Sequence, residues 1–446
     1  MKSSSILSRI SGDLGLMILT TGFLTMVGQL VWPFKAIYIL LLGGNYFHIG
    51  VIAALGALAS VVPSLLGGYY ADFATRRELI WVMNLTMAAI ALLYSYALDW
   101  VWILVISVLD AMAFSFRQPA LNALVADSTD FDNRAQCYAL WSVLPPLFGF
   151  ASPLFMGVLS ERYDTLNLIR FGYKLLFYAY ILSSVLLYFF LDKNDRFNKT
   201  QKVRPTVILK NDFLKDLVGL IRELPIRMWA LTLMGVLYGL GSSLSGPFWI
   251  TYATVDVIHL SFSEWGTIIG VNTILSTIIS FPIAKIADEK GRWKILSISL
   301  LLTPLTIIGF INCRGFLQTC LLCAAMTVIS CMGMTSSQAL FADLSYPCQR
   351  GRLTAIWGVL GVTQSFNLNA NFVSFISSPL SFVGGYLYNE VAKALPLYTQ
   401  SFLVLMTGLI GLAFMSEIPL IGGSQTGIRF VKHTPRKEQK SQLNRA

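Results

Sequence analysis

The sequence predicts an all-α membrane protein with twelve transmembrane helices arranged in two pseudo-symmetric six-helix bundles. Of its 446 residues, 55% are apolar and only 13% are charged. The mean hydropathy of +0.65 is higher than the surface of a soluble globular protein of this size would tolerate. Apolar runs of about 20 residues, long enough to cross a bilayer, recur along the chain. The second half repeats the motifs of the first half, which indicates a duplicated unit.

Twelve apolar spans can be placed in the sequence, and they are expected to be helices. The runs are too long and too uniformly apolar for the alternating strands of a barrel. The first span contains Pro33 and Lys35, is too long for a secretory signal and shows no small-residue cleavage site, so we expect a retained helix. The predicted spans are residues 14–42, 47–70, 79–98, 100–125, 135–160, 167–191, 228–255, 262–287, 293–311, 315–341, 352–388 and 396–418.

The longest polar interval divides the spans six and six. The expected domains are an N-terminal bundle at 1–191, a cytoplasmic linker at 192–227, a C-terminal bundle at 228–421 and a basic cytoplasmic tail at 422–446. Within the linker, apolar residues gather on one side of a possible helix at 208–223, which predicts an amphipathic helix at the membrane surface.

Lysine and arginine positions predict the orientation. With both termini in the cytoplasm, that face receives 26 of these residues and the opposite face receives five. The net charge of +10 therefore reflects topology and contact with anionic lipid headgroups. Because the basic residues are scattered over many loops, nucleic-acid binding is not expected. The prediction is an integral protein of the plasma membrane, in contact with the lipid bilayer and monomeric.

Neither a metal site nor a cofactor site is expected. Cys320 and Cys323 form a C-x-x-C pair inside an apolar span, without a second pair or a nearby histidine, and we interpret them as small apolar residues. No phosphate-binding glycine loop, metal-binding histidine motif or Ser/His/Asp arrangement is visible. An enzyme is therefore not predicted.

Two loops carry the same charged motif. Asp72 follows the second span, and Asp288 holds the equivalent place after the eighth span; each has a small residue four positions before it and an arginine four positions after it. Both loops resemble the signature small-x-x-x-Asp-x-x-Gly-Arg-Arg/Lys of the major facilitator superfamily. The first copy departs from it at Thr75, where the signature has glycine. The resemblance covers residues 14–418 and implies a twelve-helix transporter of small molecules.

The resemblance also implies a gate at the cytoplasmic face. The motif aspartate would face the start of a helix from the other half, where the helix dipole favours a carboxylate. The motif arginines would pair with the acid that ends the fourth helix. The alternative is that these charges serve topology alone. The residues expected in the gate are Gly68, Asp72, Arg76, Arg77, Asp127, Arg134, Asp288, Gly291, Arg292, Asp343 and Arg350.

Charge within the hydrocarbon region is costly and points to function, and three residues stand out there: Lys35, Asp110 and Arg117. Asp110 and Arg117 are seven residues apart, hence on one face of the fourth helix and about 10 Å apart along it. Asp110 is a candidate proton-coupling or substrate group, or else a structural partner of Lys35 or Arg117. Lys35 either extends to the outer membrane boundary or contacts an anionic substrate.

The repeat also identifies where the halves differ. Residues 33–38 align with 247–252, so that Trp249 replaces Lys35 in the second half. Such differences are expected where an asymmetric ligand binds. A polar run at 364–371 predicts a break in the eleventh span, either a distortion without a direct role or a broken helix lining the cavity. Further candidates for the substrate cavity are Gln29, Trp32, Trp249, Tyr252, Asn272, Gln338 and Gln364.

The predicted function is secondary active transport of a small organic solute by alternating access. Export is the leading direction because the interior is aromatic and sparsely charged; proton coupling and facilitated transport both remain open. Uptake of a metabolite and a non-transporting sensor are the alternatives. Resemblance to the drug/proton antiporter branch is weaker: its fourth-helix arginine is Ser107 here, and its fifth-helix Gly-Pro-x-x-Gly-Gly is only partly present at 152–157.

Overall fold

The computed structural model describes residues 12–73, 76–128, 134–191, 226–344 and 378–415, and all regular structure in these ranges is helical. Eleven helices there are long and apolar enough to cross a membrane. These observations confirm the predicted all-α class. Most of the predicted span at 352–388, including the polar run at 364–371, lies outside the described residues, as do the predicted amphipathic helix at 208–223 and the tail at 422–446.

The first half contains six membrane spans, and side-chain caps fix where two of its helices begin. The Asp99 carboxylate accepts a hydrogen bond from the Trp102 N–H at 3.0 Å, and that of Asp164 accepts one from the Asn167 N–H at 3.0 Å. The elements are α2 (Asp13–Gly28), η1 (Trp32–Phe34), α3 (Lys35–Leu41), α4 (Tyr46–Phe73), α5 (Arg76–Ser95), α6 (Trp100–Asp127), α7 (Arg134–Phe148), α8 (Ser152–Ser160) and α9 (Thr165–Phe190).

The second half repeats this order. Ser261 and Glu264 form a capping box at the start of the eighth span, in which each side chain accepts a hydrogen bond from the other's backbone N–H. The elements are α11 (Ile226–Ser245), η4 (Gly246–Phe248), α12 (Trp249–Thr251), η5 (Tyr252–Asp256), α13 (Phe262–Lys290), α14 (Arg292–Ile311), α15 (Phe316–Leu344), α17 (Ser378–Tyr386), η6 (Leu387–Val391) and α18 (Leu395–Met415).

The first span of each half breaks at a proline. Pro33 lies in the 3-10 turn η1, and Pro247 lies in η4, which is the equivalent turn of the second half. Proline lacks the N–H that would continue an α-helical ladder, so the helix tightens into a short turn before it resumes. The sequence repeat therefore reappears as a repeated backbone feature.

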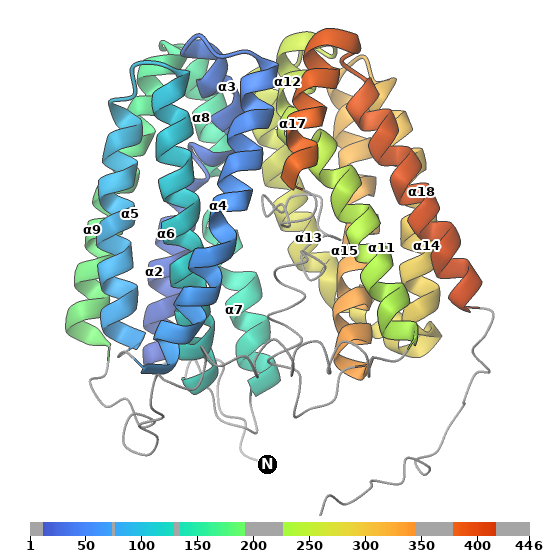
Figure 1. The fold of residues 1–446 in the computed structure, drawn as a ribbon, viewed down its shortest axis with the longest axis horizontal. Coiled ribbons are helices and arrows are strands. Elements are labelled where there is room, and N and C mark those ends of the chain that lie inside the picture. Colours follow the sequence, from blue (N-terminus) through green and yellow to red (C-terminus); the bar gives the residue numbers. More distant parts are fainter. Residues whose placement is uncertain (1–11, 74–75, 129–133, 192–225, 345–377, 416–446) are drawn as a thin grey trace, which may run out of the picture. The chain divides into compact units, whose positions relative to one another are not determined.

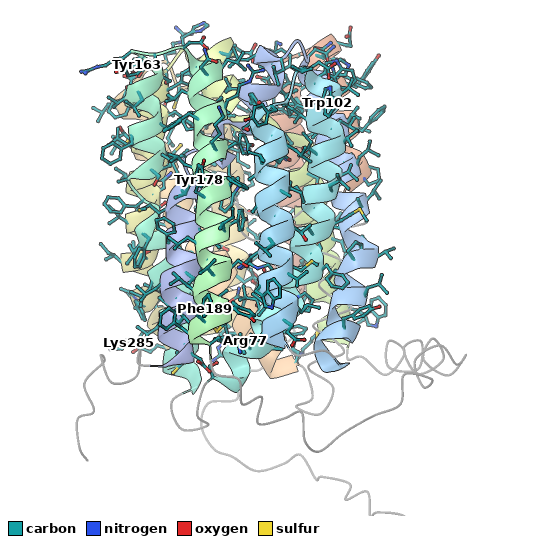
Figure 2. All side chains as sticks on the ribbon, turned by 90° about the vertical axis from the view of Figure 1, so that its left-hand side faces the viewer. Arg77, Trp102, Tyr163, Tyr178, Phe189 and Lys285 are labelled. Atoms are coloured by element: carbon teal, nitrogen blue, oxygen red, sulfur yellow. The ribbon has the colours of Figure 1, made fainter. Side chains whose placement is uncertain are left out.

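Large apolar side chains cover the outer surface of the helices. On α9, Tyr178 is 65% exposed and Phe189 is 70% exposed. Figure 2 labels both along the face of the molecule that is turned to the viewer. So extensive an apolar surface is typical of contact with lipid tails and not with water.

The two halves approach each other most closely through two equivalent helix pairs, α4 with α17 and α13 with α8 (Figure 1). A Cβ atom on Gly50 of α4 would lie 2.3 Å from the Ser381 carbonyl oxygen of α17. A Cβ atom on Gly266, which holds the equivalent position on α13, would lie 2.3 Å from the Pro153 carbonyl oxygen of α8. Both approaches are possible only because glycine has no side chain.

A second pair of glycines completes this contact from the opposite helices. A Cβ atom on Gly157 of α8 would lie 2.3 Å from the Phe262 carbonyl oxygen, and one on Gly385 of α17 would lie 3.0 Å from the Tyr46 carbonyl oxygen. Phe262 and Tyr46 are the first residues of equivalent helices in the two halves. We call the end of the bundle that carries these four glycines the closed end. It is the end opposite to that where α2 begins and α18 finishes.

Candidate functional site

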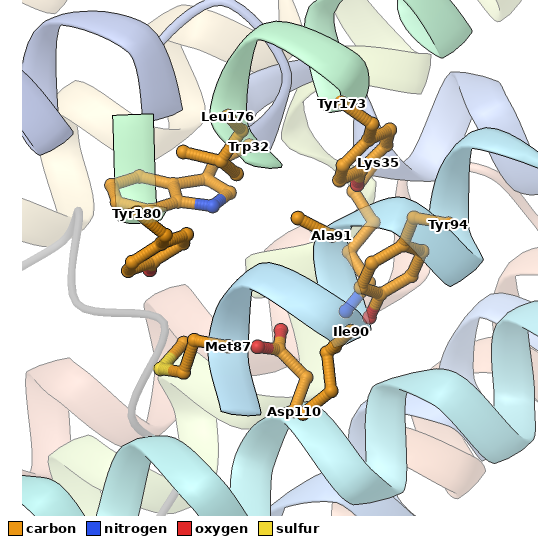
Figure 3. A pocket seen from close by; sticks show the side chains of 10 residues that line it. All are labelled: Trp32, Lys35, Met87, Ile90, Ala91, Tyr94, Asp110, Tyr173, Leu176 and Tyr180. Atoms are coloured by element: carbon orange, nitrogen blue, oxygen red, sulfur yellow. The ribbon is translucent and has the colours of Figure 1, made fainter. Parts of the chain in front are cut away.

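A small pocket lies within the first half, among α3, α5, α6 and α9 (Figure 3). Its volume is about 30 Å³, which is space for roughly two water molecules. Three of the residues predicted from the sequence meet here: Trp32, Lys35 and Asp110. The complete lining is Trp32, Lys35, Met87, Ile90, Ala91, Tyr94, Asp110, Tyr173, Leu176 and Tyr180. Three residues predicted to line the substrate cavity therefore lie together inside the first half.

Lys35 lies against an aromatic ring in this pocket. Its Nζ atom is 5.4 Å from the centroid of the Tyr94 ring, a cation–π contact. The ring is held in place on two sides: it stacks on Tyr173 with centroids 4.6 Å apart, and the Tyr94 hydroxyl donates to Ser107 Oγ at 2.9 Å. The Tyr38 hydroxyl donates to the Tyr94 carbonyl oxygen at 2.7 Å. Lys35 therefore faces an aromatic wall inside the first half.

Asp110 is on the other side of the same pocket, where its carboxylate points toward Met87 (Figure 3). Its charge and that of Lys35 act on each other, but within the described part of the chain no ion pair joins the two at 4.0 Å or less. The acid and the base are therefore neighbours held apart. Ser107, which occupies the position of the antiporter arginine, serves here as the partner of Tyr94.

Arg117 is also buried, two helical turns further along α6. Its side chain is 5% exposed, and its Nε atom has no hydrogen-bond partner. In the described ranges no acid lies within 4.0 Å of its guanidinium. The structure does not bring Arg117 into the pocket that Lys35 and Asp110 share.

The equivalent positions of the second half are apolar. In the alignment of the halves, Lys35 corresponds to Trp249, Tyr94 to Phe310 and Asp110 to Met326. Trp249 packs on Phe310 with centroids 4.6 Å apart, in the place of the contact between Lys35 and Tyr94. Phe310 is fully buried and Met326 is 6% exposed. The repeat thus carries one charged pocket and one apolar counterpart.

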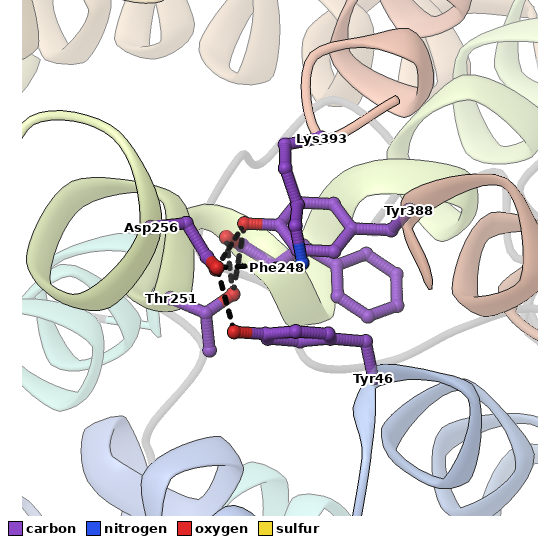
Figure 4. A network of polar contacts seen from close by, with 6 residues as sticks. All are labelled: Tyr46, Phe248, Thr251, Asp256, Tyr388 and Lys393. Carbon is purple, nitrogen blue, oxygen red and sulfur yellow. Dashed lines mark hydrogen bonds and ion pairs between the residues drawn. The ribbon is translucent and has the colours of Figure 1, made fainter. Parts of the chain in front are cut away.

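A second polar cluster lies at the closed end, and sequence reasoning missed it (Figure 4). The Asp256 carboxylate accepts hydrogen bonds from the Tyr46 hydroxyl at 2.6 Å and the Tyr388 hydroxyl at 2.7 Å, and it pairs with Lys393 Nζ at 3.3 Å. The Lys393 Nζ atom is also 3.6 Å from the centroid of the Tyr46 ring. We call these four residues the latch, because Tyr46 belongs to the first half and the other three belong to the second.

Two π-helical segments place two of the four latch residues. Asp256 ends η5 and Tyr388 lies in η6, the two π-helices in the described chain. A π-helix widens the helical turn, which changes the direction of the side chains that follow. The available signal in the sequence was an acid at the end of the seventh span and a lysine among the five basic residues predicted on the face opposite the termini. Neither shows that the two meet.

Three other predicted cavity residues are scattered. Trp249 Nε1 donates to Ser245 Oγ at 3.3 Å, and the Tyr252 hydroxyl donates to the Ile311 carbonyl oxygen at 3.0 Å, so both are held inside the second half. Gln29 contacts Gly149, since a Cβ atom on that glycine would lie 3.0 Å from Gln29 Cγ.

The last three predicted cavity residues differ in exposure. Asn272 has a buried Oδ1 atom without a hydrogen-bond partner. Gln338 is exposed on α15, and Gln364 lies outside the described residues.

The charged motif is described best in its second copy. Arg292 binds Asp288 Oδ1 through Nη2 at 2.7 Å, and its Nη1 donates to the Ala339 carbonyl oxygen of α15 at 3.4 Å. Gly291 has φ of +98°, a conformation that a side chain disfavours, which explains the glycine of the signature. In the first copy, the Arg77 guanidinium lies 5.3 Å from the Tyr188 ring centroid. The side chains of Asp72, Arg76, Asp127, Arg134, Asp343 and Arg350, and the surroundings of Gly68, lie outside the described part.

Within the described ranges, no group of three or more His, Cys, Asp or Glu residues could hold a metal ion. The polar groups that line the pocket are those of a lysine, an aspartate, three tyrosines and a tryptophan.

Comparisons with known proteins agree with the helical architecture. A family model described as Major Facilitator Superfamily matches residues 17–363. The chain is 22% identical over 370 residues to the uncharacterized MFS-type transporter YhjO of Bacillus subtilis (strain 168), covering 80% of this chain and 84% of that protein.

Solved structures share the fold at low identity, and two of them serve as examples. One is a bacterial homolog of the human lysosomal transporter Spinster, in an inward-facing and unoccupied conformation, with a TM-score of 0.65 and 13% identity over 92% of this chain and 96% of that one. The other is the peptide transporter POT, with a TM-score of 0.69 and 15% identity over 90% of this chain and 94% of that one. Because the family model matches most of the sequence, the chain belongs to the Major Facilitator Superfamily and is a membrane transporter.

Proposed function

We propose that this chain is a secondary active transporter that moves a small organic solute by alternating access, with export as its leading direction. One observation carries the proposal: Lys35 and Asp110 share a pocket in the first half, whereas their counterparts in the second half are Trp249 and Met326. Charged groups in a bilayer are costly and persist mainly where they act on an ion or a solute. If these positions served packing alone, the two halves would not need charged residues in one and apolar residues in the other.

The contact between the halves supports alternating access. At the closed end the halves meet through glycine contacts and through the bond from Tyr46 to Asp256. Small residues let helix backbones approach closely without locking side chains together. Such a contact can separate as one half rocks against the other, which would open this end while the opposite end closes.

Asp110 is the proposed coupling group. A carboxylate in a pocket open to only about two waters can bind a proton on one side of the cycle and release it on the other. If Asp110 does not carry a proton, the same pocket serves a facilitated carrier, and uptake becomes the alternative direction.

The test begins with growth of a deletion strain on a panel of toxic compounds and nutrients, which identifies transported probes. Purified protein in proteoliposomes is then given a pH gradient and a probe from this panel. We expect Asp110→Asn to abolish accumulation driven by the gradient while exchange of the probe across the bilayer continues. Asp99→Asn is the matched control, because Asp99 is an exposed acid at the start of the same helix and asparagine keeps the cap.

Two outcomes oppose the proposal in different ways. Undiminished uphill transport by Asp110→Asn would eliminate this residue as the proton carrier. A protein that binds a probe but never exchanges it across the bilayer would be a sensor and not a carrier.

The proposal also includes a gate at the end opposite the closed end, both termini in the cytoplasm, and a monomer in the plasma membrane. The bond between Arg292 and Asp288, and the contact of Arg292 with α15, support a role for the motif in fixing that end. Asp72→Asn is expected to shift the population in which the cytoplasmic face is closed. Unchanged distances between labels on the two halves would count against the gate.

A further inference from the structure

We infer that the pocket between Lys35 and Asp110 binds the head of a zwitterionic solute, with its ammonium group at Asp110 and its carboxylate at Lys35. This inference rests on the proposed function, because it names the substrate class of the same site. Only the two charges of the head group are specified, and the rest of the solute is not.

The first step is that the acid and the base are close but not joined. Both side chains line one pocket, and their charges interact. Among the described residues, no ion pair of 4.0 Å or less involves either one. An ionised group in a bilayer needs a partner of opposite charge, since desolvation without one is costly. A ligand that brings one charge of each sign supplies both partners.

The second step is that the protein itself holds the two charges apart. Lys35 Nζ lies over the Tyr94 ring at 5.4 Å, and that ring is fixed by its stacking on Tyr173 and by its hydroxyl bond to Ser107. In Figure 3 the Tyr94 ring stands beside the Lys35 amine, while the Asp110 carboxylate points away toward Met87. Because Lys35 and Asp110 are held apart, they do not form a salt bridge with each other. A ligand head that carries both charges can therefore bind between them.

The charges of Lys35 and Asp110 act differently on each class of ligand. When Asp110 is ionised, a simple anion would be attracted by Lys35 but repelled by Asp110, and a simple cation would be attracted by Asp110 but repelled by Lys35. A neutral solute would bring no opposite charge to either group. Only a solute with both charges satisfies the two groups together, at no change in the net charge of the pocket.

The volume of the pocket limits which part of a solute can enter it. The volume of about 30 Å³ has room for roughly two water-sized groups, so only charged groups of a solute can enter it and the rest of the solute stays outside. Trp32 and Tyr180 lie across the pocket from Tyr94 (Figure 3), so aromatic side chains border the pocket on both sides. In the second half Trp249, Phe310 and Met326 fill the equivalent space with apolar groups. We therefore expect one head site per chain.

The experiment uses solutes that share a body and differ only in charge. Phenylalanine is compared with 3-phenylpropanoate, which lacks the amino group, and with phenethylamine, which lacks the carboxylate. Leucine, 4-methylpentanoate and 3-methylbutylamine form a second set. Binding to the purified full chain is measured by thermal shift and by tryptophan fluorescence, and exchange is measured by counterflow in proteoliposomes. Wild-type protein should bind the zwitterion of at least one set about tenfold or more tighter than its two truncated analogues.

Two variants should change the preference in opposite directions. Asp110→Asn should remove the advantage of the amino group, so that the carboxylate analogue binds as well as the zwitterion. Lys35→Met should remove the advantage of the carboxylate, so that the amine binds as well. Lys174→Met is the matched control, because Lys174 is an exposed lysine that also lies over a tyrosine ring, Tyr96, at 5.5 Å. It should leave every preference unchanged.

The outcomes separate this inference from the proposed function. Exchange of an anion, a cation or a neutral analogue in preference to the zwitterion would overturn the zwitterion site while leaving a transporter. Binding of the zwitterion with the two preference changes, but without exchange across the bilayer, would support the site and overturn transport. Failure of every probe to bind, or variants that weaken all analogues equally, would overturn the inference.

Discussion

The bond from Tyr46 to Asp256 offers the sharpest test of how the halves are held together. Tyr46→Phe removes the hydroxyl that crosses between the halves and leaves the ring face against Lys393. Asp256 is 10% exposed and keeps its bonds to Tyr388 at 2.7 Å and to Lys393 at 3.3 Å. The variant therefore does not strand a buried charge, and its effect is confined to one bond between the halves.

The magnitude follows from the kind of bond that is lost. A hydrogen bond to a charged acceptor contributes about 1.5–3 kcal/mol. Each 1.4 kcal/mol is about a tenfold change in an equilibrium constant. The ratio of closed to open populations at this end should fall roughly 10- to 100-fold.

The assay is the distance between spin labels at Tyr163 and Leu317, which are 64% and 68% exposed and lie on opposite halves. The background carries replacements of the six cysteines. Tyr252→Phe is the control, because it loses a hydroxyl bond to the Ile311 carbonyl oxygen within the second half. Equal distance distributions for Tyr46→Phe and wild type would refute the latch, and an equal shift in the control would show that any lost tyrosine bond has this effect.

Three further predictions follow from the helix contacts and the loops. Gly50→Ala should force the halves apart and lower the melting temperature, because its Cβ atom would lie 2.3 Å from the Ser381 carbonyl oxygen. Gly315→Ala is the control and should have little effect, because nothing lies within 4 Å of its Cβ position. Similar melting curves for the two variants would contradict the tight contact at Gly50. Gly291→Ala should reduce stability by about 1–3 kcal/mol through its positive φ, as measured by thermal or denaturant unfolding; an unchanged unfolding midpoint would rule out that strain. The hydrogen bond from the Ser263 hydroxyl lowers the pKa of Glu161 below its ordinary value of 4.5, so this contact between the halves is at full strength above pH 4.5 and is lost as the pH falls through the lowered pKa. The closed population measured by the spin-label distance should fall in that acid range, and Glu161→Gln should remove this part of the pH dependence; an identical profile in the variant would assign it to other groups.

The sequence was sufficient for the helical class because membrane insertion acts on local composition. An apolar run of about 20 residues has to satisfy its own backbone hydrogen bonds, so it becomes a helix whatever its neighbours are. The proline breaks at Pro33 and Pro247 were equally local, since a missing N–H interrupts any helix. The duplication could also be found, because it is written as repeated motifs at fixed offsets.

The candidate site could be predicted only in part. Burial in a span singled out Lys35, Asp110 and Arg117 as a set, but α6 directs Asp110 into the pocket with Lys35 and leaves Arg117 elsewhere. Spacing along one helix gives the face on which residues lie, and it says nothing about which neighbouring helix covers each part of that face. The tyrosines of the pocket were missed because buried tyrosines in a span look like ordinary packing residues.

By itself, the sequence determined the membrane-spanning helices, the repeated plan of the two halves and the rarity of charge within the lipid region. Only the tertiary structure decided that Asp256, from the seventh span, meets Tyr46 from the second and Lys393 beyond the eleventh. The physical reason is that hydrophobic insertion depends on each segment alone, whereas the latch and the charged pocket depend on how helices distant in the chain are packed and turned against one another.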